Sequence, residues 1–416
     1  MMDTVRKFTY VLALFMLLST KSFAFSPIQI DTTRLAIVKQ NIYDGTASER
    51  TINAYKALLK KADKWLITKN PTVINKTILP PTGNKHDYLS LSRYWWPNPE
   101  TPDGLPWIRK DGETNPETQT DAVDRQRLGA MTKGVKNLSL AYYFSDDERY
   151  AEKAVSMLKT WFLDEETLMH PNLEFAQGVP GISNGKPSGV LDGKSIPTIV
   201  PEAIAILSNS PFWTKNDTEK INKWLTDYLT WLTESELGHI ENNQKNNHGS
   251  WYKFQVSTLA LYLGNETLTK ETVSLAQQSL ETQLDFEGKQ IHELARTRSF
   301  FYSCYNLNAL TSIAIIGDQV GMDMWNYNTK DDKSLGLAVN YLSPVINGKA
   351  WPYTDIHGVD LSGLLPTLVR MSKHSESKEY IDLLSKTTTI LIEKEKSTGI
   401  KNQVLEELIL TGYLNI

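Results

Sequence analysis

The chain has only one cysteine, Cys304, among its 416 residues, which excludes an intramolecular disulfide. Nothing beside Cys304 marks it as an activated thiol, so we predict a small buried hydrophobe there. A basic surplus is also lacking, because 44 Lys and Arg residues face 48 Asp and Glu residues. We therefore expect no nucleic-acid partner, and an anionic ligand would need a local cluster of cations.

Long apolar runs are absent beyond the N-terminal segment. In that segment Arg6 and Lys7 precede an apolar stretch over residues 8–18, and Ser22-Phe23-Ala24 follows it. This order is typical of a secretory signal peptide, and the stretch is short for a membrane span. We predict a signal peptide over residues 1–24 and export to the periplasm or the medium. No cysteine lies directly after the apolar stretch, where a lipid would be attached. We therefore expect neither a lipid anchor nor membrane insertion after cleavage.

Apolar residues at three- and four-residue spacing are abundant, whereas alternating strand patterns are scarce. They predict roughly a dozen helices, over residues 32–42, 49–66, 125–145, 147–163, 196–210, 216–235, 251–264, 270–284, 306–321, 332–346, 363–374, 377–394 and 402–414. Helices in series, often in pairs, indicate an all-α fold of the (α/α) toroid type, an incomplete barrel of paired antiparallel helices. A helical-repeat scaffold is the alternative, although the chain has no fixed-period motif. We expect residues 25–416 to form a single domain.

Two long loops interrupt this pattern, over residues 79–118 and 169–196, and both are rich in Pro and Gly. Long loops in a compact domain usually carry function. The chain also has 11 Trp and 18 Tyr residues. Their flat rings are suited to stacking on sugars, although large helical proteins also bury such residues.

Two short polar segments contain candidate functional residues. The first, "NNHGSWY", brings Asn246, Asn247 and His248 together just before a predicted helix. One interpretation is a helix cap, and the other is a set of donors and acceptors for one ligand. The second, "HELARTRSFFYSCY", combines acidic, basic and phenolic residues: Glu293, Arg296, Arg298, Tyr302 and Tyr305.

Helical spacing places Arg298, Tyr302 and Tyr305 on one helix face, where a cation could lower a phenol pKa. The alternative is an ordinary helix with packed tyrosines and surface arginines. The functional interpretation fits β-elimination of a 4-linked hexuronan, in which Asn and Arg neutralise the carboxylate while Tyr and His move protons. This chemistry requires no metal or other cofactor, and we expect none.

Two other functions compete with this hypothesis. An inverting glycoside hydrolase would need two opposed carboxyl groups, and the candidates Glu174, Asp192, Glu202 and Glu293 form no recognisable pair. An exported glycan-binding protein without catalysis is the third possibility. Such helical binders are usually lipid-anchored, and the missing cysteine argues against it.

The two segments together, "NNH" and "ELAR…RS..Y..Y", resemble the alginate lyase superfamily of the polysaccharide lyase family 5 type. The segments "YLSLSRYWWPNP", "MHPNLEFAQGVPG" and "GVLDG" resemble its Bacteroidetes members, which act on glucuronan and alginate, so that the likeness covers roughly residues 80–310. The resemblance implies an incomplete (α/α) barrel and an active site of Asn247, His248, Arg296 and Tyr302. The interval from Arg296 to Tyr302 is one residue shorter than in that family, so Arg298 and Tyr305 remain alternatives.

With the signal-peptide pattern, the resemblance implies an exported polysaccharide lyase that acts on an anionic polysaccharide. We expect the protein to be a monomer. Tyr302 would protonate O4 and would also be the base where H5 and O4 lie on one side of the sugar. His248 would be the base where they lie on opposite sides, and Asn247 and Arg296 would bind the carboxylate. The expected substrate-binding residues are Arg93, Tyr94, Trp95, Trp96, Asn172, Gln177, Asn246, Glu293, Arg298, Tyr305 and His357.

Overall fold

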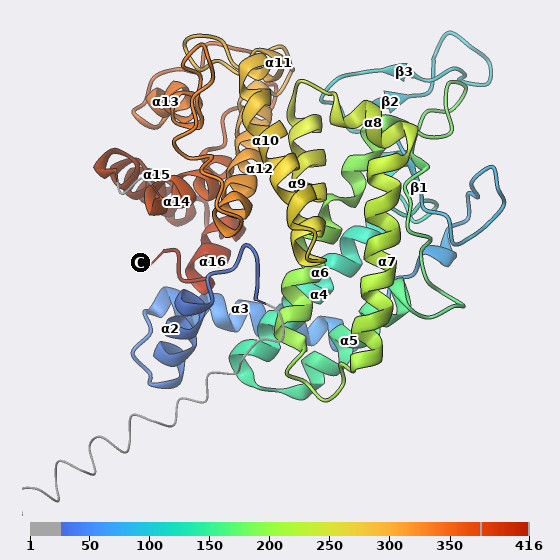
Figure 1. Ribbon diagram of the computed structural model, residues 1–416, viewed down its shortest axis with the longest axis horizontal. Coiled ribbons are helices and arrows are strands. Elements are labelled where there is room, and N and C mark those ends of the chain that lie inside the picture. The colour runs from blue at the N-terminus through green and yellow to red at the C-terminus, as the bar shows by residue number, and fades with distance from the viewer. Residues whose placement is uncertain (1–25, 375–376, 415–416) are drawn as a thin grey trace, which may run out of the picture.

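The helices of the computed structural model follow one another along the chain in pairs (Figure 1). The structure describes residues 26–374 and 377–414, so the predicted signal peptide lies outside the described residues. The helices are α2 (Thr32–Tyr43), α3 (Glu49–Leu66), α4 (Arg125–Ser145), α5 (Glu148–Phe162), α6 (Ser195–Leu207), α7 (Lys215–Glu234), α8 (Glu236–Asn242), α9 (Asn247–Tyr262), α10 (Glu266–Gln283), α11 (Ile291–Leu294), α12 (Ser299–Gln319), α13 (Leu335–Ile346), α14 (Leu365–His374), α15 (Lys378–Thr398) and α16 (Gln403–Leu410).

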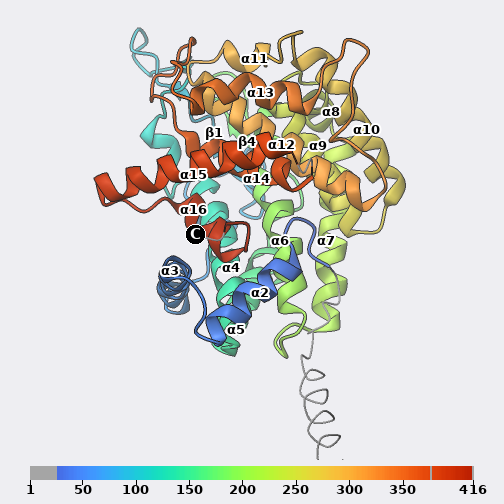
Figure 2. The same cartoon turned by 90° about the vertical axis from the view of Figure 1, so that its left-hand side faces the viewer.

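Helices α4, α6, α9, α12 and α14 form an inner row in which each helix packs against the next. Helices α5, α7, α10, α13 and α15 cover this row from outside. Helix α16 packs on α3, and α3 packs on α4, so the two ends of the described chain lie close together (Figure 2). This architecture is the (α/α) toroid that the sequence predicts. None of the helices within the described ranges is long and apolar enough to cross a membrane.

The inner and outer helices differ in the way the sequence distributes its apolar residues. In α9 every residue from Gly249 to Ala260 is buried, which fits a helix surrounded by other helices. The hydroxyls of Ser257 and Thr258 tolerate this burial because they donate to the helix carbonyls of Lys253 and Phe254, both at 2.7 Å. The outer helix α5, in contrast, buries one face only.

The two long loops contain short strands that the sequence did not predict. Strand β1 (Leu89–Leu91) pairs in parallel with β4 (Phe175–Gly178), and β2 (Trp95–Trp96) pairs antiparallel with β3 (Ile108–Arg109). The loops also contain the 3₁₀ helices η2 (Pro116–Gln119) and η3 (Pro187–Lys194), while η1 (Val73–Asn75) and η4 (Leu361–Leu364) lie elsewhere. Ser92 donates its backbone N–H to Gly178 at 2.9 Å, so the end of β1 lies beside the end of β4.

The buried carboxylate of Asp192, in η3, ties these loops to the helices. Its Oδ2 accepts hydrogen bonds from Tyr88 at 3.0 Å and Ser90 at 2.5 Å. Its Oδ1 accepts a hydrogen bond from Gln177 at 2.9 Å and forms an ion pair with Arg125 at 2.9 Å. One side chain therefore joins the start of β1, the end of β4 and the start of α4.

We expect replacement of Asp192 by alanine to lower the free energy of unfolding by about 3–5 kcal/mol, because it leaves Arg125 and three polar groups without their acceptor. Denaturant unfolding measures the change. Asp227→Ala is the control, since the exposed pair of Asp227 with Lys223 contributes only about 0.5 kcal/mol. A loss in Asp192→Ala no larger than in the control would contradict this role.

Candidate active site

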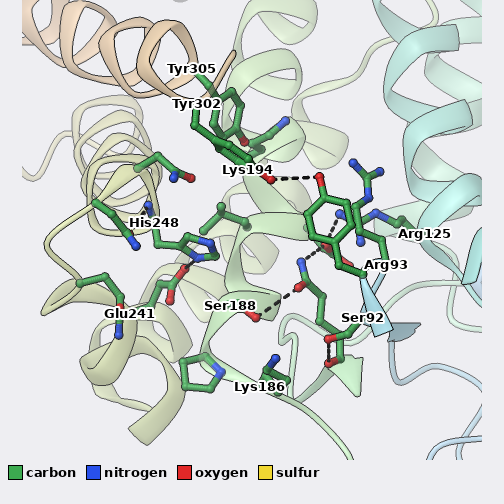
Figure 3. A pocket seen from close by; sticks show the side chains of 18 of the residues that line it. Ser92, Arg93, Arg125, Lys186, Ser188, Lys194, Glu241, His248, Tyr302 and Tyr305 are labelled. Carbon is green, nitrogen blue, oxygen red and sulfur yellow. Dashed lines mark hydrogen bonds and ion pairs between the residues drawn. The ribbon is translucent and has the colours of Figure 1, made fainter. Parts of the chain in front are cut away.

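A cavity of about 800 Å³ opens where four inner helices begin (Figure 3). Its lining includes Arg125 of α4, Ser195 of α6, Asn247 of α9 and Phe301 of α12, all within the first turn of their helices. The two long loops contribute much of the remaining wall, and Glu241 of α8 and Arg296 before α12 also line it. Ten residues predicted from the sequence lie in this one cavity: Arg93, Tyr94, Trp95, Gln177, Asn246, Asn247, His248, Arg296, Tyr302 and Tyr305.

Cations outnumber carboxylates in this lining. Six basic side chains, Arg93, Arg109, Arg125, Lys186, Lys194 and Arg296, face only two acidic ones, Asp192 and Glu241. The whole chain carries a net charge of -4, so the positive potential is local to the cavity. A concave basic site of this kind concentrates polyanions.

The adjacent residues Asn246 and Asn247 have different hydrogen-bond partners. Asn246 is the N-cap of α9, and its Oδ1 accepts the backbone N–H of His248 at 3.0 Å. Asn247 donates its backbone N–H and its Nδ2 to Glu293, at 2.6 and 2.8 Å. Burial raises the pKa of Glu293, and the hydrogen bonds from Asn247 oppose this shift. One amide therefore caps the helix, as the first interpretation predicts, and the other is fixed at the cavity by Glu293.

His248 pairs with a buried carboxylate. Its Nδ1 lies 2.6 Å from Oε1 of Glu241, whose side chain is buried. A carboxylate at this distance favours the tautomer with the proton on Nδ1, in which Nε2 is a hydrogen-bond acceptor. Gly249 permits the chain to turn here, because a Cβ at this position would lie 2.0 Å from the carbonyl oxygen of Gln244.

Tyr302 and Tyr94 form a pair of phenols. Tyr302 donates its hydroxyl proton to the hydroxyl of Tyr94 at 2.9 Å. Burial raises the pKa of Tyr302 and outweighs the Arg296 guanidinium, so the expected lowering of a phenol pKa by arginine is wrong at this residue. Burial also raises the pKa of Tyr94. The hydrogen bond from Tyr302 and the charges of Arg93 and Arg298 outweigh burial, so the pKa lies below its ordinary value.

Arg296 lies against the phenol pair. Its guanidinium stands 3.8 Å from the centroid of the Tyr302 ring. It donates Nε and Nη2 to Asp111, at 3.1 and 2.8 Å, which is a bidentate ion pair. Burial raises the pKa of Asp111, but Arg296 outweighs burial and holds it well below its usual range. The pair fixes the plane of the guanidinium and leaves its Nη1 side unused.

Comparisons with known proteins identify the family of this chain. A family model described as alginate lyase matches residues 72–351. The chain belongs to the alginate lyase family. An alginate lyase from Bacteroides ovatus is 34% identical, with a TM-score of 0.84 over 93% of this chain and 99% of that chain. Alginate lyase A1-III from Sphingomonas species A1 is 15% identical, with a TM-score of 0.53 over 85% of this chain and 91% of that chain. No curated protein sequence matches the chain.

The family match makes this chain a polysaccharide lyase. Three of the four carboxyl groups considered for a hydrolase, Asp192, Glu202 and Glu293, have other partners. Asp192 accepts the four bonds described above, and each oxygen of Glu293 accepts one hydrogen bond from Asn247. Glu202 accepts backbone N–H groups from Ile28, Gln29 and Ile30, and burial raises its pKa to about 7. Across residues 26–374 and 377–414, no group of three or more His, Cys, Asp or Glu side chains is placed to hold a metal.

Five predicted substrate-binding residues of this lyase lie outside the cavity lining. Glu293 is buried against Asn247 and acts on the site through it. Arg298 lies over the ring of Phe301, at 4.1 Å, which favours Arg296 for contact with a ligand. Trp96 donates Nε1 to the carbonyl of Glu113. The side chain of Asn172 accepts the backbone N–H of Glu174 and so stabilises a turn. His357 lies in an exposed loop.

Several residues that line the lyase cavity or support its lining were not predicted. Glu241, Asp111, Arg125 and Lys194 all contact or flank the predicted residues, yet no motif contains them. Glu241 precedes His248 by seven residues, an interval that a sequence cannot interpret without the bend between α8 and α9. Asp111 belongs to the first long loop, and only the fold of that loop brings it to Arg296.

We expect a spectrophotometric titration of the lyase to show tyrosinate appearing below the ordinary range of phenols, because the pKa of Tyr94 is lowered. Tyr94→Phe should remove this early phase. Tyr302→Phe removes the donated hydrogen bond and should move the phase to higher pH. Tyr341→Phe is the control, because Tyr341 pairs with the hydroxyl of Tyr353 at 3.0 Å outside the cavity. An early phase that survives in Tyr94→Phe would assign the ionisation to another group.

Proposed function

We propose that this polysaccharide lyase cleaves 4-linked polyuronates, alginate or glucuronan, by β-elimination with Tyr302 and His248 as its proton-transfer residues. The observation that supports it best is the cavity in which a phenol under a guanidinium faces an imidazole with a free Nε2. Relatives described as alginate lyases support alginate as a substrate. The signal-peptide pattern of residues 1–24 supports action outside the cytoplasm.

Arg296 and Asn247 would neutralise the carboxylate at C5. The C5 proton becomes removable only when the charge that grows on the carboxylate is stabilised. Arg296 still has both N–H groups of Nη1 for a ligand, because Asp111 occupies Nε and Nη2. Asn247 has a second hydrogen on Nδ2, and its bonds to Glu293 fix the direction in which that amide points. Both groups are therefore oriented before a substrate arrives.

Tyr302 would give its proton to O4 of the leaving sugar. Its raised pKa keeps the phenol protonated in the resting enzyme, which suits an acid. For a substrate with H5 and O4 on one side, Tyr302 must first act as a base. Tyr94 is the more readily ionised phenol of the two, and as a phenolate it would accept the Tyr302 proton while Tyr302 takes H5.

His248 would serve substrates in which H5 lies on the other side. Figure 3 shows His248 and Glu241 across the cavity from Arg93 and Arg125, with Tyr302 between the two sides. Glu241 stabilises the imidazolium that forms when Nε2 takes a proton, and it holds the ring in place. One cavity therefore presents a phenol and an imidazole to different faces of a uronate.

The proposal is tested by incubation with polymannuronate, polyguluronate and glucuronan, followed by ultraviolet absorbance, since only elimination makes an unsaturated uronate. We expect Tyr302→Phe to lower the rate by about 10²-fold or more while the fold persists, because the acid is lost. Tyr341→Phe removes a hydroxyl from the other phenol pair and should keep full activity. Near-normal turnover in Tyr302→Phe, with loss in Tyr305→Phe, would transfer the role to Tyr305.

His248→Ala should reduce cleavage of guluronate most, because there H5 faces the imidazole, and should reduce cleavage of mannuronate or glucuronate less. Thermal stability is measured beside the activity on each polymer. His170→Ala is the matched control, since His170 also binds a carboxylate, Asp87 at 2.6 Å, but lies outside the cavity. Equal loss on every polymer, in parallel with a lower melting temperature, would make His248 a structural residue.

A further inference from the structure

Three basic side chains of the cavity lining, Arg93, Arg125 and Lys194, keep unused hydrogen-bonding capacity. Arg93 Nε and Arg125 Nη1 are buried and have no hydrogen-bond partner. The Lys194 ammonium stands over the rings of Trp251 and Tyr305, 5.4 and 5.7 Å from their centroids. Within the described part of the chain, Lys194 Nζ has neither an acidic partner nor a hydrogen bond. The three residues come from three elements: the loop after β1, the start of α4 and the end of η3.

The nearby carboxylates cannot neutralise this cluster. Asp192 already accepts from Tyr88, Ser90, Gln177 and Arg125, which fills the acceptor sites of its two oxygens. Glu241 lies across the cavity and holds His248 (Figure 3). A buried, positively charged hydrogen-bond donor without an acceptor costs free energy. An anionic ligand would supply the acceptors that the chain lacks here.

We propose that Arg93, Arg125 and Lys194 form a second carboxylate-binding site, which takes the uronate next to the one that loses H5. This inference rests on the proposed function. Lys194 lies on Tyr305, about one helical turn, or roughly 5 Å, along α12 from Tyr302. That offset is close to the span of one sugar unit, so successive uronates can reach Arg296 and Lys194 together. The enzyme would then select for two consecutive uronates.

Proton binding to Lys194 accompanies this recognition. Burial lowers the pKa of Lys194 to about 8, and Arg125 and Arg93 act in the same direction, while Asp192 opposes them. Tyr305 and Trp251 face the ammonium with neutral rings. A bound carboxylate favours the charged lysine and raises its pKa again. Affinity is therefore full below pH 8 and falls above it, and binding above pH 8 takes up a proton.

Calorimetry with a mannuronate tetrasaccharide tests the site in the Tyr302→Phe background, where the probe is not consumed. We expect Lys194→Met to weaken binding by about tenfold or more and to abolish proton uptake above pH 8, whereas Lys194→Arg keeps most of the affinity. Lys333→Met is the matched control, because Lys333 also lies over an aromatic ring, Phe286 at 5.3 Å, but outside the cavity. Unchanged affinity and proton uptake in folded Lys194→Met would overturn the inference.

Polymannuronate with randomly reduced carboxyl groups gives a second test. A site that needs two consecutive uronates makes the initial rate of the wild-type enzyme fall with at least the square of the remaining uronate fraction. In Lys194→Met the exponent that relates the initial rate to the uronate fraction should fall by one. A wild-type rate that is merely proportional to the uronate fraction would overturn the inference. If no intact polyuronate gives unsaturated product, the proposed reaction fails, and the calorimetric result still decides the carboxylate site.

Discussion

Four hydrogen-bond donors share the carboxylate of Asp192, and the geometry of the cavity depends on that arrangement. The strands β1 and β4 are only a few residues long and could not hold two long loops by backbone pairing alone. Asp192 adds bonds to Tyr88 and Ser90 beside β1 and to Gln177 in β4. Its pairing with Arg125 then joins the loops to α4. Because all four acceptor positions are used, the other cations of the wall stay available for a ligand.

The proposed reacting groups share a feature, which is that each has one fixed partner. Asp111 holds Arg296, Glu293 holds Asn247, Glu241 holds His248 and Tyr94 holds Tyr302. Such partners set orientation and tautomer during folding, so that little ordering remains for the moment of binding. Three of them are carboxylates, of which Asp111 and Glu293 lie outside the cavity lining and Glu241 lines the cavity beside His248.

Much of the fold and the main site residues could be predicted from the sequence, because they depend on local patterns. Helical spacing located the inner and outer helices, and two short segments contained both Asn247-His248 and Arg296-Tyr302. The partners could not be predicted, since Asp111 reaches Arg296 across 185 positions. Burial is equally invisible in a sequence. Burial raises the pKa of Tyr302 against the expected shift. At Tyr94 burial also raises the pKa, but the hydrogen bond from Tyr302 and the nearby arginines outweigh it.

The toroid itself contributes to the charge of the site. The inner helices α4, α6, α9 and α12 all begin at the cavity, because inner helices of successive pairs run in the same direction. Each helix start has unpaired N–H groups and the positive end of its dipole. The converging helix starts therefore favour anions before any side chain is considered, and the six basic residues increase that potential. A protein with net negative charge can thereby hold a polyanion at one end of its helices, where Tyr302 and His248 lie.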